Sequence, residues 1–482
     1  MAYKYYKDNR AYIEALLKTG DAVVVNEEVD WDLEMGAIVR RVCERKGPSP
    51  YFKKIKDYPG FEAVGAPIAN YRKLAIAMGL DPETPIPNIA GEYLTRTSSG
   101  TPQKPKIVNA GDAPCKEVVW TGDDADLLNL PAPMVHDGDG GRYICTWHFV
   151  VAKDFDTETI NWGMYRQMLF DEKTMVGPVL PFSDMGKMFY NKYVPRNLPM
   201  PFATVIAPDP LSAIASCAPA AIPEDEFTSL LMGEPVEVVK CETCDLYVPA
   251  HAEIIIEGVI LPNVMIEEAP FGEYTGYRTS PREKRTVYRV KAITMRKKPI
   301  MAVSNMGVPT DEGQLLRSFS LGLEMERMLR DQGIPITGVY MLPESTHHLV
   351  VVGVKPAYAN IATQIGQLVF GSKLGPWFHM VLVVDDKTDI YNKDEIIHAL
   401  CTKCNPKTGI RVTEHGVGTP LNPFASPEDR RYGKASKVTF DCLFPPEWPA
   451  SEVPIKVSFD NVYPKEIQDK VLSKWNKYGF KD

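Results

Sequence analysis

The sequence has no apolar run long enough to cross a membrane. A membrane-spanning helix needs about 20 consecutive apolar residues, and no run in the 482 residues approaches that length. The N-terminal stretch MAYKYYKDNR also lacks the apolar core of a secretory signal peptide. We therefore expect a cytoplasmic protein without a membrane span.

A concentration of positive charge is missing as well. The chain carries 54 basic and 62 acidic residues, for a net charge of -8, and both signs are dispersed along it. Nucleic-acid binding leaves a basic track, and membrane-surface binding leaves a polybasic patch. We therefore expect no nucleic-acid partner and a small-molecule substrate.

Several common catalytic signatures are absent. The sequence contains no G-x-G-x-x-G, no Walker A motif, no H-E-x-x-H and no G-x-S-x-G. These motifs mark dinucleotide, nucleotide, zinc-protease and hydrolase sites. The usual nucleotide-binding and hydrolase interpretations therefore lose support.

The nine cysteines do not form an obvious disulfide framework, because their number is odd and they are scattered. Two C-x-x-C pairs occur, Cys241 with Cys244 and Cys401 with Cys404. Together they could supply four thiolates to a zinc ion, so a zinc-stabilised scaffold is one alternative. The pairs lie far apart within regular strand-like and helix-like patterns, and we favour reduced thiols.

The length and the hydrophobic patterns predict a mixed α+β protein of several units. Residues 1–110 read as an α/β segment, with helices expected at 9–18 and 33–45 and an apolar run at 22–25. A Pro- and Gly-rich connection precedes a boundary near residue 110.

Residues 111–310 carry short β-type runs separated by Gly, Pro and Asp, which predict a mostly antiparallel barrel or sandwich. The expected strands are 143–151, 202–206, 237–239, 252–256, 288–295 and 301–304.

Residues 311–482 return to α/β. A helix after Pro356 lies between apolar strands at 348–354 and 380–384, which is the pattern of a βαβ unit. An amphipathic helix follows Pro464 and ends near Gly479. We expect it to pack on this chain or on a partner subunit.

One acidic stretch, IEEAPFGEYTGY at 266–277, is unusual for a solvated surface. Its carboxylates, Glu267, Glu268 and Glu273, stand among Pro, Phe, Tyr and Gly. A carboxylate beside apolar surface acquires a raised pKa and can act as a general acid. The alternative is an acidic loop with one aromatic anchor.

A second stretch, NWGMYRQM at 161–168, reads as one strand with two different faces. Residues five apart on a strand point to opposite faces, so Asn161 and Arg166 could serve adjoining inorganic and carboxylate subsites. The Arg fork matches a carboxylate, on Glu268 or on a substrate. The alternative is an ordinary strand with a surface arginine.

These stretches, together with VVKCETCDLYVPA at 238–250, VSNMG at 303–307 and TDE at 310–312, resemble the UbiD family of decarboxylases. The chain is most similar to the ferulic (cinnamic) acid decarboxylase branch, from about residue 110 to the C-terminal KWNKYGF. The resemblance implies a flavin-reductase-like split β-barrel in the centre. It also implies a C-terminal oligomerisation domain, commonly in a dimer.

The resemblance further implies prenylated FMN as cofactor, a divalent metal such as Mn²⁺ or Mg²⁺, and K⁺ near the cofactor phosphate. A flavin prenyltransferase would supply the cofactor, which accepts the electrons left by loss of CO₂. The catalytic trio of the family falls on Arg166, Glu268 and Glu273. Glu273 would be the proton donor and Glu268 the partner of Arg166, while Glu267 would face elsewhere.

The implied metal ligands are Asn161, Asp184 and Glu224, with Asp184 standing where the family usually has His. The alternative interpretation of Asp184 is a turn residue. Lys373 matches a lysine that approaches the cofactor phosphate in the family, and its alternative interpretation is a loop cation. The positions implied to contact the cofactor are Asn161, Trp162, Met164, Arg166, Gln167, Ser183 and Lys373.

Two positions of the implied substrate pocket depart from the cinnamate-cleaving pattern. Arg317 replaces an apolar residue and Thr419 replaces Phe. A buried Arg requires an anionic or acceptor partner, so we expect a hydroxyaryl, heteroaryl or dicarboxylic acid as substrate. The predicted function is non-oxidative, reversible decarboxylation of an aromatic or α,β-unsaturated acid. The alternatives are a polyprenyl-hydroxybenzoate decarboxylase and a split-barrel flavin reductase.

Overall fold

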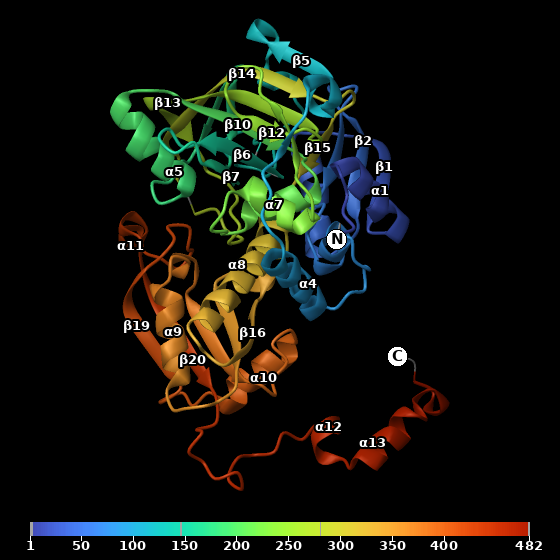
Figure 1. Ribbon diagram of the computed structural model, residues 1–482, viewed down its shortest axis with the longest axis vertical. Coiled ribbons are helices and arrows are strands. Elements are labelled where there is room, and N and C mark those ends of the chain that lie inside the picture. The colour runs from blue at the N-terminus through green and yellow to red at the C-terminus, as the bar shows by residue number, and fades with distance from the viewer. Residues whose placement is uncertain (1–2, 145–146, 280, 481–482) are drawn as a thin grey trace.

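The N-terminal segment has the expected helix, strand and helix. A computed structural model describes residues 3–144, 147–279 and 281–480 (Figure 1). It places α1 at Asn9–Thr19, β1 at Ala22–Val29 and α2 at Glu34–Glu44. The Asp8 side chain caps α1, which ends at Gly20 in the left-handed region with φ 76°. These boundaries confirm the predicted helices at 9–18 and 33–45 and the apolar run at 22–25.

One predicted strand lies in a different sheet from the one expected. The run 301–304 corresponds to β15, Ile300–Val303, which we grouped with the central strands. Instead it pairs in parallel with β3, Glu62–Gly65, in the sheet β1-β2-β3-β15, where β2 is Ser49–Ile55. All four β15 residues are buried. A short apolar run carries no signal for which sheet it joins.

The central region is built on one large, mainly antiparallel sheet. Its strand order is β7-β6-β10-β13-β14-β9-β8, with β5 also paired to β14. The long antiparallel pair of β13 and β14 runs through its middle. The strands are β5 Val118–Thr121, β6 His148–Lys153, β7 Ile160–Gly163, β8 Met168–Asp171, β9 Thr174–Gly177, β10 Met200–Ile206, β13 Ile254–Glu268 and β14 Glu283–Met295.

The sheet does not close into the predicted barrel within the part of the chain that the structure describes, because its two end strands, β7 and β8, are not paired. The predicted single strand at 161–168 is also wrong, because the structure divides it between two strands. β7 ends at Gly163, and the chain crosses residues 164–167 outside any strand before β8 begins. The predicted strand 143–151 begins later, at His148, and its residues Cys145 and Thr146 lie outside the described residues.

The C-terminal region contains a five-stranded sheet of order β16-β17-β18-β20-β19. β17 and β18 are parallel and are joined through α9, which confirms the βαβ unit. Two separate hydrophobic clusters pack in this region. One contains buried side chains of α9 and the other contains buried side chains of α10. The elements are β16 Ile336–Met341, β17 Leu349–Val354, α9 Ile361–Gly371, β18 Met380–Asp385, α10 Lys393–Lys403, β19 Ile410–Val417 and β20 Lys434–Cys442.

Helix α8, Glu312–Asp331, joins the two bodies seen in Figure 1. Asp311 and Gln314 form a reciprocal capping box at its start. Its first half contributes Phe319 to the core shared by the N-terminal and central regions, and its second half contributes Met325 to the C-terminal core. The helix therefore couples the two bodies through packing on both of its halves.

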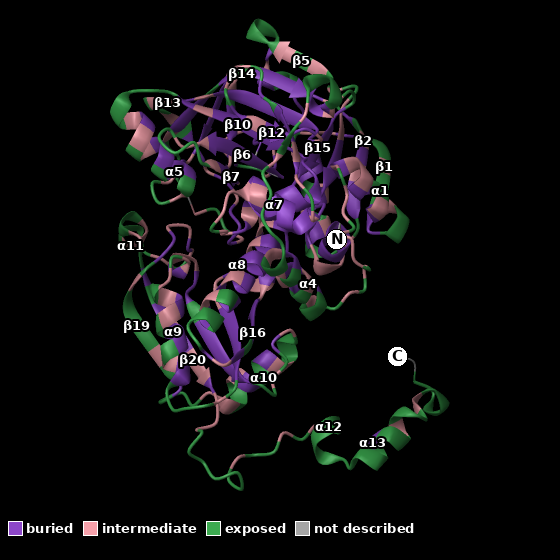
Figure 2. Cartoon of the chain, in the orientation of Figure 1, coloured by how far each residue is buried: buried purple, intermediate pink, exposed green. Residues whose placement is uncertain are grey.

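The last residues extend away from the globular part as an exposed tail (Figures 1 and 2). It contains α12, Phe459–Val462, and α13, Lys465–Leu472, followed by a single turn of 3₁₀ helix at Trp475–Tyr478. Among the described residues, no helix combines the length and apolar character that a membrane crossing needs.

Candidate active site

Arg166 contacts both of the carboxylates that the sequence singled out. Its Nε lies 2.9 Å from Glu268 Oε1 and its Nη2 lies 3.2 Å from Glu268 Oε2. Its Nη1 donates a short hydrogen bond to Glu273. Arg166 lies in the segment that separates β7 from β8, Glu268 ends β13, and Glu273 follows in the next loop. The predicted pairing of Arg166 with Glu268 is therefore present.

The surroundings of this trio are aromatic and dry. The Tyr143 hydroxyl donates to Glu268 Oε1 over 2.8 Å. The Phe271 ring lies 4.5 Å from the Tyr143 ring and 5.2 Å from the Arg166 guanidinium. Glu268 is fully buried and Glu273 is 3% exposed. Glu267 is exposed, as predicted.

Burial and charge set the protonation of these groups. Burial raises the pKa of Glu273, and the positive charge of Arg166 offsets only part of that rise, because the nearby charges of Glu268 and Asp139 oppose it. Burial alone would lower the pKa of Arg166, but the two carboxylates raise it. The site therefore holds a permanent cation beside a carboxyl group that retains its proton more readily than an exposed Glu.

A second loop fixes the backbone next to Glu273. Asp139 Oδ1 accepts from the Gly272 N–H over 3.0 Å, and Asp139 Oδ2 lies 2.8 Å from His136 Nδ1. The other ring nitrogen, Nε2, lies 2.7 Å from Asn305 Oδ1. A Cβ at position 272 would meet the His136 ring at 2.6 Å. Only glycine leaves room for this approach.

The sequence analysis did not identify His136 and Asp139 as residues that hold the loop of Glu273. His136 and Asp139 stand in HDGDGG, which is typical of a turn. Their contacts with Gly272 and Asn305 come from distant parts of the chain, and no local pattern encodes them.

The predicted metal ligands form a second, looser polar cluster, in which Asn161 contacts Glu224 and Asp184 adds a negative charge nearby. Glu224 accepts from the Asn161 amide over 3.2 Å and from the Trp162 N–H over 2.8 Å. Asp184 is exposed, with Oδ1 lying 2.9 Å from Lys187 Nζ and 4.0 Å from Lys373 Nζ. Burial raises the pKa of Glu224 to about 8, and the charge of Asp184 adds to the rise.

This donor chemistry fits a hard cation. The three side chains offer amide and carboxylate oxygens, the ligands that Mn²⁺ and Mg²⁺ accept. A buried carboxylate with a raised pKa lacks a compensating charge, which a divalent ion supplies. Lys373 reaches this cluster from the C-terminal region, so the cluster lies where the two bodies meet.

The other predicted cofactor positions make their own contacts. The Trp162 ring is buried and stacks on Phe149 at 4.6 Å. Gln167 is buried and accepts from the Thr204 hydroxyl over 2.8 Å. Met164 Sδ lies 3.4 Å from Cys217 Sγ, and Ser183 caps the short helix α5, Asp184–Met188.

The predicted substrate-pocket residues lie beside Tyr274, one residue after Glu273. The Arg317 guanidinium on α8 lies 4.1 Å from the centre of the Trp377 ring, and Thr419 is buried. The Tyr274 ring stacks on His347 at 4.5 Å. Both His347 ring nitrogens are buried without a hydrogen-bond partner. Burial lowers the pKa of His347, and the Arg317 charge lowers it further, so the imidazole is neutral.

The four-thiolate zinc site is wrong. Cys241 and Cys244 lie near Glu257 in the central region, whereas Cys401 is exposed on α10 and Cys404 packs in the C-terminal core. The two C-x-x-C pairs belong to different folded bodies, which their spacing in the sequence could not reveal.

Comparisons with known proteins match the chain along nearly its whole length. Family models described as the N-terminal, Rift-related and C-terminal domains of 3-octaprenyl-4-hydroxybenzoate carboxy-lyase match residues 13–92, 106–309 and 314–442. The pyrrole-2-carboxylic acid decarboxylase of Pseudomonas aeruginosa is 30% identical, with 98% of this chain and 99% of that protein covered. Ferulic acid decarboxylase 1 of Saccharomyces cerevisiae is also 30% identical, with 98% of each chain covered.

Solved structures agree with the sequence relatives. The closed form of the Sedimentibacter hydroxybenzoicus vanillic acid decarboxylase has a TM-score of 0.88 at 28% identity, covering 98% of this chain and 100% of that one. An evolved dimeric form of the UbiD-class enzyme HmfF from Pelotomaculum thermopropionicum, in complex with prFMN, has a TM-score of 0.79 at 26% identity. That match covers 94% of this chain and 99% of the other.

Replacing Arg166 by Met tests the charge balance of the trio. We expect the variant to lose about 3 to 5 kcal/mol of stability at neutral pH, because two buried carboxylates lose their cation. The unpaired carboxylates acquire higher pKa values in the folded state than in the unfolded state. The loss should therefore grow as pH rises through and above the ordinary Glu range and shrink in acid.

Urea unfolding at about pH 5 and pH 8 measures this difference. The matched control is Arg196→Met, which removes an exposed guanidinium 3.2 Å from Asp156 and should change little at either pH. An equal loss for both variants, or no pH dependence for Arg166→Met, would contradict the charge argument.

Proposed function

Because the chain belongs to the UbiD family of carboxy-lyases, we propose that it is a prenylated-FMN-dependent decarboxylase of a hydroxyaryl or heteroaryl carboxylic acid. The observation that carries this proposal is the half-buried Arg166 in contact with two buried carboxylates, Glu268 and Glu273. The family models bear the name of a polyprenyl-hydroxybenzoate enzyme. The relatives that span the whole chain are named for smaller acids, and we favour a small substrate.

Each side chain of the trio has a distinct role in the proposed reaction. Arg166 orients the substrate carboxylate, and Glu268 fixes the guanidinium through two contacts. The carbon–carboxylate bond breaks, CO₂ leaves, and Glu273 gives its proton to the carbon that carried the carboxylate. Glu273 then regains a proton from solvent. Prenylated FMN, when bound, supplies the sink for the electron pair released with CO₂.

We assign the cation next to the cofactor to Asn161, Glu224 and Asp184. Its support is the oxygen-only donor set and the raised pKa of Glu224, about 8. Asp184 is the exposed member and is already held by Lys187, so it would have to exchange that lysine for the metal. Lys373 would approach the cofactor phosphate, with K⁺ as the second cation near it.

The pocket chemistry favours a substrate with a polar ring. His347 is neutral, so its imidazole presents one donor and one acceptor, and Arg317 adds a charged donor. An unsubstituted phenyl ring would leave the two buried His347 ring nitrogens unpaired, at a cost of about 1 to 3 kcal/mol each, and would offer no acceptor to the half-buried Arg317. A hydroxyl, a ring N–H or a second carboxylate would satisfy them.

The exposed tail supports a homodimer or a higher homo-oligomer, with residues 311–482 as the oligomerisation unit, 111–310 as the cofactor- and metal-binding unit and 1–110 as the N-terminal unit. The side chains of Val457 and Leu472 are 84% and 57% exposed. Burying such side chains stabilises an interface by about 25 cal/mol per Å². A second copy of the chain would cover them.

The activity test uses the protein co-expressed with a flavin prenyltransferase. We expect the released cofactor to have the mass of prenylated FMN, and CO₂ to be released from pyrrole-, furan- or hydroxybenzene-carboxylic acids in preference to cinnamic acid. Glu273→Gln should retain the cofactor but lose turnover by about 100-fold or more, because proton delivery is removed. The isosteric Glu267→Gln serves as the control, since Glu267 is exposed.

Release of unmodified FMN together with NAD(P)H-dependent flavin reduction would instead show a reductase. Full activity of Glu273→Gln would remove that residue as the proton donor. Efficient cleavage of cinnamic acid alone would refute the polar-pocket argument.

The pH profile should depend on Asp139. Its negative charge raises the pKa of Glu273, so Asp139→Asn should lower that pKa. Glu273 must be protonated to deliver its proton, and the alkaline limb of the kcat profile should therefore move to lower pH. Asp137→Asn is the control, because Asp137 is exposed and contacts Arg278 only through its carbonyl oxygen. An alkaline limb at the same pH in wild type and Asp139→Asn would contradict the effect of the Asp139 charge on the pKa of Glu273.

Oligomerisation is tested by light scattering. A protein lacking residues 453–482, or carrying Leu472→Asp, should have a smaller assembly mass than wild type. Lys470→Asp on the same helix should leave the mass unchanged. An unchanged mass in the shortened protein would exclude the tail from the interface.

A further inference from the structure

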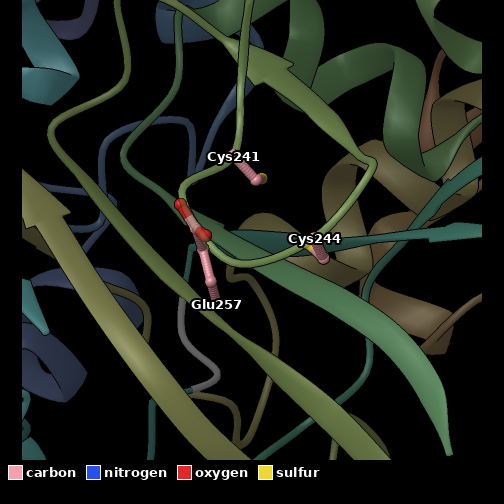
Figure 3. Close-up of side chains that lie close together, drawn as sticks. All are labelled: Cys241, Cys244 and Glu257. Carbon is pink, nitrogen blue, oxygen red and sulfur yellow. The ribbon is translucent and has the colours of Figure 1, made fainter. Parts of the chain in front are cut away.

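A cluster outside the active site has the composition of a zinc site. The loop Cys241 to Leu246 joins β11, Glu237–Lys240, to β12, Tyr247–Pro249, which pair as an antiparallel hairpin. The Cys241 N–H donates to the Leu246 carbonyl over 2.9 Å and closes the loop. The C-x-x-C pair therefore occupies a hairpin tip. Figure 3 shows Glu257 rising from β13 toward this loop.

The three side chains are close enough to share one ion. The ligand atoms of Cys241, Cys244 and Glu257 all lie within 4.8 Å of one another. A tetrahedral zinc ion with bonds of about 2.0 to 2.3 Å holds its ligands roughly 3.5 to 3.8 Å apart, so a small side-chain adjustment brings them into range. Two thiolates at C-x-x-C spacing favour zinc over the hard ions expected at the active site.

The neighbouring charges hold the carboxylate in place. Lys116 Nζ lies 3.1 Å from Glu257 Oε1, and its side chain is 2% exposed. The Thr243 N–H donates to Glu257 Oε2 over 2.9 Å. These hydrogen bonds orient the carboxylate as outer contacts orient a metal ligand.

Lys116 also offsets part of the charge of the complete site. A divalent ion with two thiolates and one carboxylate carries one excess negative charge. The buried Lys116 ammonium lies 3.1 Å from Glu257 and also 3.1 Å from the exposed Glu242, which keeps contact with solvent. A nearby cation lowers the cost of holding this negative charge away from water. The active-site chemistry uses none of these residues.

We propose that Cys241, Cys244 and Glu257 bind one zinc ion, with the fourth position taken by solvent. Cys241 and Glu257 are buried, whereas Cys244 is only half-buried. The ion and its bound water would therefore reach the site from the solvent beside Cys244. The bound ion fastens the hairpin of β11 and β12 to β13, the strand that ends at Glu268. Its role is structural.

The primary experiment measures zinc in the full-length protein, purified under reducing conditions, saturated with ZnCl₂ and desalted. We expect about one tightly held equivalent, lost in the Cys241→Ser/Cys244→Ser variant and weakened at least tenfold in affinity in Glu257→Gln. The matched control is Cys401→Ser/Cys404→Ser, the other C-x-x-C pair of the chain, which should retain the ion. Glu224→Gln should retain it as well, which separates this site from the proposed catalytic metal.

A second set of measurements probes the two thiols directly, and its first part uses only the wild-type protein. In the wild-type protein, zinc should protect Cys241 and Cys244 from alkylation and leave the exposed Cys401 reactive, as read by peptide mass spectrometry. Substitution with Co²⁺ should produce a thiolate-to-cobalt charge-transfer band that the Cys241→Ser/Cys244→Ser variant lacks. Absence of stoichiometric zinc, equal alkylation with and without it, or a disulfide between Cys241 and Cys244 under the same reducing conditions would overturn the proposal.

Discussion

One guanidinium between two buried carboxylates is the constraint on which the active site depends. Arg166 can neutralise only one of Glu268 and Glu273, so the low-dielectric site favours a proton on one of them. Glu268 accepts two contacts from Arg166 and one from Tyr143, and Arg285 lies 3.9 Å away. Glu273 has one contact with Arg166 and lies near the charge of Asp139. The distribution of donors therefore favours the protonated form at Glu273, whose pKa burial raises.

This distribution depends on backbone positions that distant segments fix. Asp139 holds the Gly272 N–H, His136 joins Asp139 to Asn305, and the Asn305 amide donates to the Gly36 carbonyl of α2 over 2.7 Å. The N-terminal segment is thus connected to the loop that presents Glu273. Helix α8, which carries Arg317, connects the same region to the C-terminal sheet. The residues of the proposed site therefore depend on packing in all three regions.

The sequence predicted features that are local or chemically distinctive. Helix α1 was predicted at 9–18 and lies at Asn9–Thr19, and apolar runs identified strands such as β10, β17 and β18. The crowding of Glu268 and Glu273 around Pro270 and Phe271 indicated a dry carboxyl group. In each case the signal lies within a few residues of the feature.

Features that depend on long-range pairing were not predictable in the same way. β15 has the same apolar pattern as a central strand but joins the N-terminal sheet, because a run of four buried residues fits either partner. The segment at 161–168 alternates like a strand but leaves the sheet after Gly163, where the chain must turn to present Arg166. Contacts such as Asp139 with Gly272 join loops 133 residues apart, and nothing local records them.

The strand β13 shows how one element can serve both stability and chemistry. Glu257 lies near its start and Glu268 at its end. An extended chain from Glu257 to Glu268 spans about 35 Å. The pairing of β13 with β14 contains register shifts between Glu257 and Gly258 and between Ile260 and Met265, so its path is not fixed by a regular ladder alone. Holding Glu257 through Lys116 and the Cys241–Cys244 loop restrains one end of the strand. At the other end, Glu268 pairs with Glu283 of β14, and Arg166 and Tyr143 hold its side chain. The ion pair of the proposed active site therefore also helps to anchor the strand that carries it.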